Sequence, residues 1–249
     1  MTLAMLCCST PVLAMPLPDC AGGVEIAHAR VTRVEKNGAL VLTDGRAVLL
    51  EGIRLPMAGE RGPAALADDA LAQLRQLAMA APLTLTATRP KEDRYDRVRV
   101  QAFGDNWLQM EMLRRGLARV QIAPDRSECA PDFYEAEQAA RAAGRGLWAF
   151  PAYGVRMSNN FTADQGSFQI VEGRVANADS RDGPVVLNFD STRGFAAVIA
   201  KEDLRAFRDI DPSLEELVGK RIRVRGVIED LGGRPGISLS NPFQIEILH

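Results

Sequence analysis

The chain has 249 residues, of which 47% are hydrophobic and 25% charged, and its formal net charge is −2. This length suits two domains of ordinary size, each with its own core. The slight acidic balance excludes the overall excess of Lys and Arg that marks strong non-specific nucleic-acid binding, but it allows a local basic patch.

The N-terminus has the composition of an export signal. Residues 3–8 are apolar, and Pro11-Val12-Leu13-Ala14 ends in the kind of small residue that signal peptidase requires. We therefore expect a signal peptide over residues 1–14 and a periplasmic or secreted protein. No other apolar run approaches the roughly 18 residues of a transmembrane helix. Two alternatives stay open: an N-terminus that is merely apolar, and a lipoprotein attached through Cys7 or Cys8.

Cysteine usage fits this location. Of the four cysteines, Cys7 and Cys8 would leave with the signal peptide, so the mature chain would keep Cys20 and Cys129. Two thiols in an exported protein most simply form one disulfide. A metal site is disfavoured, because two lone cysteines and two distant histidines lack ligand spacing. The sequence thus predicts a Cys20–Cys129 disulfide and no bound metal.

The first half alternates strand and helix patterns. Asp44-Gly45 marks a hairpin turn, and Leu66, Ala70, Leu74 and Leu77 recur at helical spacing. Strands are expected over 24–34, 39–42, 47–50, 83–88, 98–103 and 117–122, and helices over 64–80, 106–115 and 131–143. This order favours a small barrel decorated by helices over a doubly wound sheet.

The second half differs in kind. Strands are expected over 168–176, 183–190, 194–199, 220–229, 236–239 and 243–248, with a short helix over 202–207. These short strands with turns between them predict a small antiparallel β domain of the oligonucleotide/oligosaccharide-binding (OB) type. We divide the chain into a signal peptide (1–14), an N-terminal segment (15–27), a first domain (28–150), a linker (151–165) and a second, OB-like domain (166–249).

Four stretches of the first half together resemble the staphylococcal nuclease-like (thermonuclease) family over about residues 28–150. They are the loop Gly52-Ile53-Arg54-Leu55-Pro56 after a hairpin, the segment Asp93-Arg94-Tyr95-Asp96-Arg97, and the helix endings Arg115-Gly116-Leu117-Ala118 and Gly146-Leu147-Trp148. The resemblance implies a mainly β fold with helices (α+β), namely a five-stranded OB-type barrel with three helices.

The resemblance also implies a mechanism for active members. Carboxylates hold calcium against a phosphodiester, a glutamate activates or orients water, and two arginines neutralise charge on the phosphoryl group. Here the metal aspartate position holds Arg54, the glutamate position holds Met57, and the first arginine position falls at Leu49. The turn expected to carry the other metal aspartate, residues 35–39, contains none. The retained position is Arg97.

Other residues offer little chemistry to replace the lost carboxylates. Glu51, Glu60, Asp68 and Asp69 lie near the loop in sequence, and each is expected to be a solvated charge. His28 and His249 are expected to be strand or surface residues. No cofactor is predicted, and calcium enters only if the site is rearranged.

Binding is the remaining class of function. Three groups of cations stand out: Arg94, Arg97 and Arg99 around Tyr95; Arg114, Arg115 and Arg119; and Arg221, Arg223 and Arg225 on one face of a strand. OB-type barrels bind single strands with such basic and aromatic faces. The nucleic-acid-binding candidates are Arg94, Tyr95, Arg97, Arg99 and Arg223. The alternative for each group is an ordinary solvent-exposed face with no ligand.

The sequence therefore favours an exported protein with a nuclease fold that acts as a binding or scaffold protein and is not a calcium-dependent nuclease. Its partner would be nucleic acid or an envelope protein. The alternative is a secreted phosphodiesterase that cleaves single-stranded nucleic acid through a rearranged site.

Overall fold

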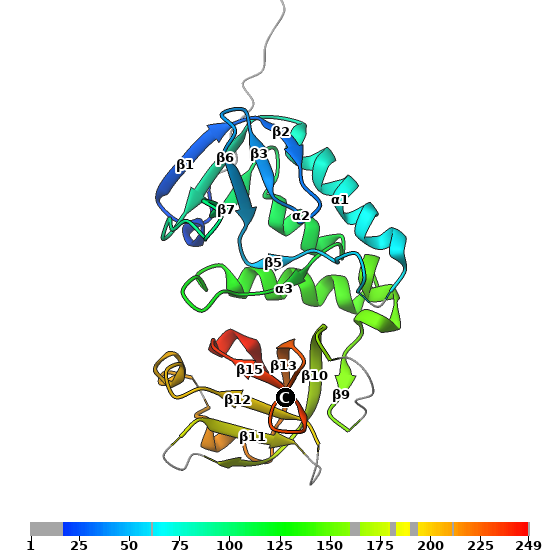
Figure 1. Cartoon of the computed structure of the whole chain (residues 1–249), viewed down its shortest axis with the longest axis vertical. Helices are drawn as coiled ribbons and strands as arrows, with labels where there is room; N and C mark the ends of the chain where they lie inside the picture. The colour runs from blue at the N-terminus through cyan, green and yellow to red at the C-terminus, as the bar shows by residue number, and fades with distance from the viewer. Residues whose placement is uncertain are drawn as a thin grey trace, which may run out of the picture.

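The structure, a computed structural model, describes residues 17–60, 62–159, 165–179, 183–189, 194–210 and 212–248. Two β-rich bodies stack along the long axis, and the three α-helices belong to the first (Figure 1). The expected signal peptide, with Cys7 and Cys8, and His249 lie outside the described residues. Within those ranges, no helix has the length and apolar character needed to cross a bilayer.

The first body confirms the expected mixture of strands and helices. Its strands are β1 (Val24–Ala29), β2 (Val31–Val34), β3 (Leu40–Leu42), β4 (Ala47–Leu50), β5 (Ile53–Arg54), β6 (Leu83–Ala87), β7 (Val98–Phe103) and β8 (Arg119–Val120). Its helices are α1 (Ala64–Met79), α2 (Leu108–Arg114) and α3 (Ala130–Ala142).

The main sheet of this body curls into a barrel. Its strand order is β1-β6-β7-β4-β3-β2, so β1 and β2 lie at opposite edges of the sheet. Only Arg30 separates these two strands in the chain, and the single strand expected over 24–34 is therefore wrong. Because one residue joins both edges, the sheet must bend round until they meet, which is the geometry of the expected barrel.

The loop after β4 depends on a glycine. Gly52 has a φ of +79°, and a Cβ at this position would lie 2.4 Å from the ring of Phe133 on α3. A side chain here would therefore clash and strain the backbone. Beyond Gly52 the chain forms β5, which pairs with β8 in a register that sets Arg54 opposite Arg119.

A disulfide joins the N-terminal segment to the start of α3. Cys20 and Cys129 are bonded, with their Cα atoms 5.1 Å apart. The pairing expected from the sequence is therefore confirmed, and it ties the 3₁₀ turn at Asp19–Ala21 to the third helix of the barrel.

The second body is also β-rich. Its strands are β9 (Arg156–Met157), β10 (Phe168–Asp179), β11 (Val185–Phe189), β12 (Ala196–Ile199), β13 (Arg221–Val227), β14 (Glu229–Asp230), β15 (Pro235–Leu239) and β16 (Ile245–Leu248). The long strand β10 serves two partners: its first part pairs with β13 and its last part with β11, with a bulge between Val175 and Asn177. The expectation of purely antiparallel pairing is wrong, because β12–β15 and β9–β10 are parallel. β9 lies in the stretch expected to be a linker.

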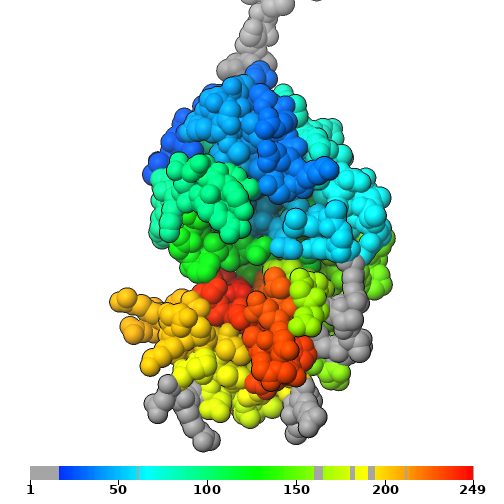
Figure 2. Space-filling model, in the orientation of Figure 1, coloured from blue at the N-terminus to red at the C-terminus, as the bar shows by residue number. Residues whose placement is uncertain are grey.

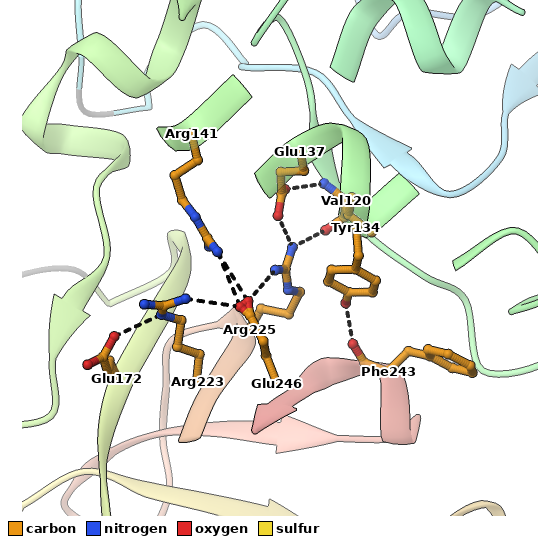
Figure 3. Close-up of polar contacts among 9 residues, drawn as sticks. All are labelled: Val120, Tyr134, Glu137, Arg141, Glu172, Arg223, Arg225, Phe243 and Glu246. Atoms are coloured by element: carbon orange, nitrogen blue, oxygen red, sulfur yellow. Dashed lines mark hydrogen bonds and ion pairs between the residues drawn. The ribbon is translucent and has the colours of Figure 1, made fainter. Parts of the chain in front are cut away.

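Charged side chains cross the junction between the two bodies (Figure 3). Arg225 on β13 donates from Nη1 to Glu137 Oε2 on α3 at 2.8 Å, and Val120 N donates to the other oxygen of Glu137 at 2.7 Å. Arg141 donates to both oxygens of Glu246, each at 3.2 Å. Burial alone would lower the pKa of Arg225, but the attraction to Glu137 and other neighbours outweighs it and the pKa is raised. The junction is thus held by matched buried charges.

Candidate anion-binding site

A hollow in the first body gathers the positions that the family resemblance singled out. We call it the barrel pocket. It has a volume of about 290 Å³, and its lining includes Lys36, Leu49, Arg54, Met57, Arg97 and Arg99. Figure 2 shows the surface hollowed on this face of the first body, above its junction with the second. Four family positions, Leu49, Arg54, Met57 and Arg97, therefore lie around one cavity, together with Lys36 from the turn that holds the fifth.

Arg97, the retained family position, is held by a neighbouring carboxylate. Its Nε and Nη2 atoms donate to Asp93 Oδ2 at 3.0 and 2.8 Å, and Asp93 Oδ1 accepts from the backbone N–H of Tyr95. The hydrogen bonds from Arg97 lower the pKa of Asp93 to about 2. The Arg97 guanidinium is thereby fixed before any ligand arrives.

Arg99 lies beside the position from which the first family arginine is missing. β4 and β7 pair in parallel, and Leu49 is the register partner of Arg99. Partner residues project from the same face of a sheet, so Arg99 brings a guanidinium next to the apolar side chain of Leu49. Within the described residues Arg99 makes no hydrogen bond or salt bridge, although it attracts the carboxylate of Glu51. The barrel pocket therefore has two neighbouring arginines.

Arg54, at the family's metal position, is tied into the wall of the pocket. Its Nη2 atom donates to Glu60 Oε1 at 2.8 Å, and Arg119 Nη2 donates to Glu60 Oε2 at 2.9 Å. Two arginines directly opposite each other on paired strands repel, so Glu60 is needed between them. The expectation that Glu60 is merely a solvated charge is wrong, because its side chain is only 13% exposed.

Arg119 is buried rather than part of a surface cluster with Arg114 and Arg115. Its side chain is 2% exposed, its Nη1 atom donates to the carbonyl of Phe168, and the ring of Tyr153 lies 5.0 Å from its guanidinium carbon. Burial lowers the pKa of Arg119, which the nearby charge of Glu60 partly offsets. This residue stabilises the junction between the bodies and does not face a ligand.

Glu51 also departs from its expected place. It is 5% exposed and does not line the barrel pocket. Its Oε2 atom lies 3.9 Å from Arg126 Nε, beyond hydrogen-bonding distance. Burial raises the pKa of Glu51 from 4.5 to about 7. The expected solvated carboxylate is therefore a buried one, placed away from the pocket, whereas Asp68 and Asp69 are exposed as expected.

The five nucleic-acid-binding candidates are divided among three places, of which the barrel pocket holds Arg97 and Arg99. Arg94 and Tyr95 lie on an exposed turn, with the Tyr95 ring 4.8 Å from the guanidinium carbons of both Arg94 and Arg97. Arg223 lies in the junction cluster of Figure 3, where it donates to Glu172 at 2.8 Å and Glu246 at 3.2 Å. The structure brings Arg97 and Arg99 together and leaves Arg223 apart from them.

Lys36 is the pocket residue that sequence reasoning missed. It is exposed, lines the barrel pocket, and makes no hydrogen bond or salt bridge in the described part of the chain. Its position in the turn where the family has a metal aspartate was the available signal, because that turn must face the loop that carries Arg54.

The lining does not fit the calcium ion that the family fold implies. Calcium takes oxygen ligands, mostly carboxylates. Among the described residues that line the barrel pocket there is no aspartate or glutamate, and four are cations. Elsewhere in the described ranges, no group of three or more His, Cys, Asp and Glu side chains could hold a metal. What the arrangement can do is attract and hydrogen-bond an anion.

Comparison with known proteins identifies a family for the part of the chain that carries most of the barrel pocket. A search of curated proteins returned no match. The family model described as staphylococcal nuclease homologue matches residues 47–150, from the start of β4 to the 3₁₀ turn after α3. This match includes the loop with Arg54 and Met57 and the turn with Arg97. Residues 47–150 of the first body are therefore similar to the staphylococcal nuclease family.

Proposed function

We propose that this protein is an exported binding protein that uses its nuclease fold to hold an anionic group in the barrel pocket, without calcium and without hydrolysis. One observation carries the proposal: cations line the pocket where calcium-dependent relatives are expected to present carboxylates. An arginine at position 54 would repel calcium rather than bind it, and although Glu60 partly matches the charge of Arg54, Arg99 and Lys36 add attraction for a phosphate or carboxylate.

The charges of the pocket support anion binding in two ways. Arg97 is pre-oriented by Asp93, so little side-chain freedom is lost when it meets a ligand. Arg99 and Lys36 have no carboxylate in hydrogen-bond or salt-bridge contact among the described residues, so their attraction is available to a ligand. The planar guanidinium groups favour ligands with paired oxygens, such as phosphate.

The disulfide supports export. Disulfides persist in oxidising compartments such as the periplasm and the extracellular space. Together with the apolar N-terminus, the Cys20–Cys129 bond favours a periplasmic or secreted location. We retain the proposed boundaries of the first domain (28–150) and of the second, OB-like domain (166–249).

Two measurements on the chain without residues 1–14 test the proposal. Isothermal titration with pyrophosphate in EDTA should give binding that Arg99→Gln and Lys36→Gln each weaken by about tenfold, the typical effect of losing a charged hydrogen bond or ion pair. Arg33→Gln, an exposed cation on the same barrel, is the matched control for net charge and should leave binding unchanged.

Digestion of single-stranded DNA and RNA with calcium supplies the second measurement. No cleavage is expected. Robust calcium-dependent cleavage that Arg97→Ala abolishes would instead establish the secreted phosphodiesterase alternative. Absence of pyrophosphate binding at low ionic strength would also refute the proposal, because little salt is then present to screen the attraction between the pocket cations and pyrophosphate.

A further inference from the structure

A second cavity adjoins the barrel pocket at the junction of the two bodies. We call it the junction cavity; its volume is about 370 Å³. Arg99, Ile53 and Gln121 line both cavities. The remaining wall combines residues 122–124 of the first body with residues of the second body, including Glu229, Ser238 and Gln244. A ligand anchored in the barrel pocket can therefore extend past Arg99 onto the second body.

The junction cavity differs in chemistry from the barrel pocket. Its polar side chains are mainly amides and hydroxyls, from Gln121, Ser238, Ser240 and Gln244, together with the carboxylate of Glu229. Arg225 also lines it, but its charge is matched by Glu137 at 2.8 Å. Gln244 is hydrogen-bonded within the wall, but the Gln121 amide, the serine hydroxyl oxygens and the Glu229 carboxylate can still hydrogen-bond a ligand, and the set carries no excess positive charge. It suits the neutral, hydroxylated part of a ligand.

Part of this wall is held rigidly. Gln244 Nε2 donates to the carbonyl of Arg225 at 3.0 Å, and Gln244 Oε1 accepts from the backbone N–H of Ser240 at 2.7 Å. Ser238 Oγ donates to Glu229 Oε2 at 2.9 Å, which orients the carboxylate. Fixed polar groups of this kind bind with less loss of conformational freedom than mobile ones.

A nucleic-acid strand fits this cavity poorly. Its phosphates would pass the carboxylate of Glu229 and be repelled. Strand binding also uses accessible aromatic faces. Phe168 is the aromatic residue of the described cavity lining, and it is buried with the Arg119 guanidinium 4.9 Å from its ring. Exposed Tyr95 lines neither cavity.

We propose that the two cavities form one composite site for an anionic carbohydrate. Its acidic group lies in the barrel pocket beside Arg97, Arg99 and Lys36, and its hydroxylated body lies in the junction cavity, where Glu229 accepts hydrogen bonds from sugar hydroxyls. This inference rests on the proposed anion binding and adds the ligand class and the role of the second body.

Titration calorimetry on the chain without residues 1–14 tests the inference with four probes: inorganic phosphate, trehalose, trehalose 6-phosphate and a ten-nucleotide oligo-dT. Trehalose 6-phosphate should bind at least tenfold more tightly than phosphate or trehalose, since it alone fills both cavities. A gain of less than threefold over phosphate would overturn the composite site and leave the proposed anion binding intact.

Variants separate the two cavities. Glu229→Gln and Ser238→Ala, which touch the junction cavity alone, should each weaken trehalose 6-phosphate by about three- to tenfold and leave phosphate unchanged. Arg99→Gln should weaken both probes. For a nucleic-acid ligand, Glu229→Gln should strengthen binding instead of weakening it. Tighter binding of oligo-dT than of trehalose 6-phosphate, together with a further gain in Glu229→Gln, would refute an anionic carbohydrate as the ligand. Failure of phosphate to bind would instead refute the proposed function.

Discussion

Arg225 on β13 and Glu137 on α3 form a salt bridge of 2.8 Å across the domain junction, with side chains 3% and 1% exposed. Of the strand cations for which a solvated face was one reading, Arg225 therefore points into an interface, whereas Arg221 is 57% exposed. The pair also anchors part of the wall of the junction cavity, because Arg225 lines that cavity and is bonded to the first body. The first prediction concerns this pair.

Glu137→Gln should destabilise the protein by about 3–5 kcal/mol, because it removes the carboxylate hydrogen-bonded to the buried Arg225 guanidinium and leaves Glu246, at 4.0 Å, as the nearest acid. Glu137→Gln combined with Arg225→Met should recover much of that loss, since no charge is then buried. Urea unfolding measures both. Glu135→Gln, an exposed carboxylate on the same helix, is the control and should change stability by less than about 0.5 kcal/mol. An equal loss of stability in Glu137→Gln and Glu135→Gln would contradict the role given to the buried pair.

Glu60 should be structurally essential although it lies next to a binding pocket. It separates Arg54 from buried Arg119, so Glu60→Gln leaves two opposed cations without an acid between them. We expect a loss of about 3 kcal/mol in the free energy of unfolding. Glu25→Gln, exposed on β1, is the control. Unchanged stability of Glu60→Gln would mean that the two arginines are not constrained as described.

Glu51 should make stability depend on pH. Burial raises its folded-state pKa from 4.5 to about 7, so between these values the folded state binds more protons than the unfolded state. The free energy of unfolding is therefore highest below pH 4.5 and falls as the pH rises to about 7, because ionising the buried Glu51 carboxyl disfavours the folded state. Arg126, Glu128, Arg99 and Asp125 are the charges that face it.

Glu51→Gln should remove this dependence, and at pH 8 it should be more stable than the parent chain by roughly 3 kcal/mol. Denaturant unfolding from pH 4 to pH 8 measures the difference between the two chains. A difference that stays constant with pH would show that Glu51 does not titrate in this window.

The Cys20–Cys129 disulfide closes a segment with a sequence separation of 109 residues. In the chain-entropy model its removal costs about 4–5 kcal/mol, so the Cys20→Ala and Cys129→Ala double variant should unfold at much lower denaturant concentration. For the chain without residues 1–14, thiol titration under denaturing conditions without reductant should detect almost no free thiol. Two thiols per chain would refute the bond.

Local patterns in the sequence predicted much of the first domain. The hairpin with Gly45, the loop of Arg54 and Met57, and α1 and α3 to within one residue at each end follow from turn residues and helical periodicity, which act over a few neighbouring residues. The break at Arg30 was missed because no Gly or Pro marks it; closure of the barrel imposes it.

The residue order was enough to predict the nuclease-like loop, the lack of carboxylates in it and the pairing of Cys20 with Cys129. The surroundings of each charged side chain became visible in the folded protein alone. Arg99 lies beside Leu49 because β4 and β7 pair in parallel, and Glu137 and Arg225 are buried because the two bodies pack on them, whereas Glu60 is 13% exposed. A local pattern records that a residue is charged, but whether water or a second domain surrounds that charge depends on contacts between residues distant in the chain.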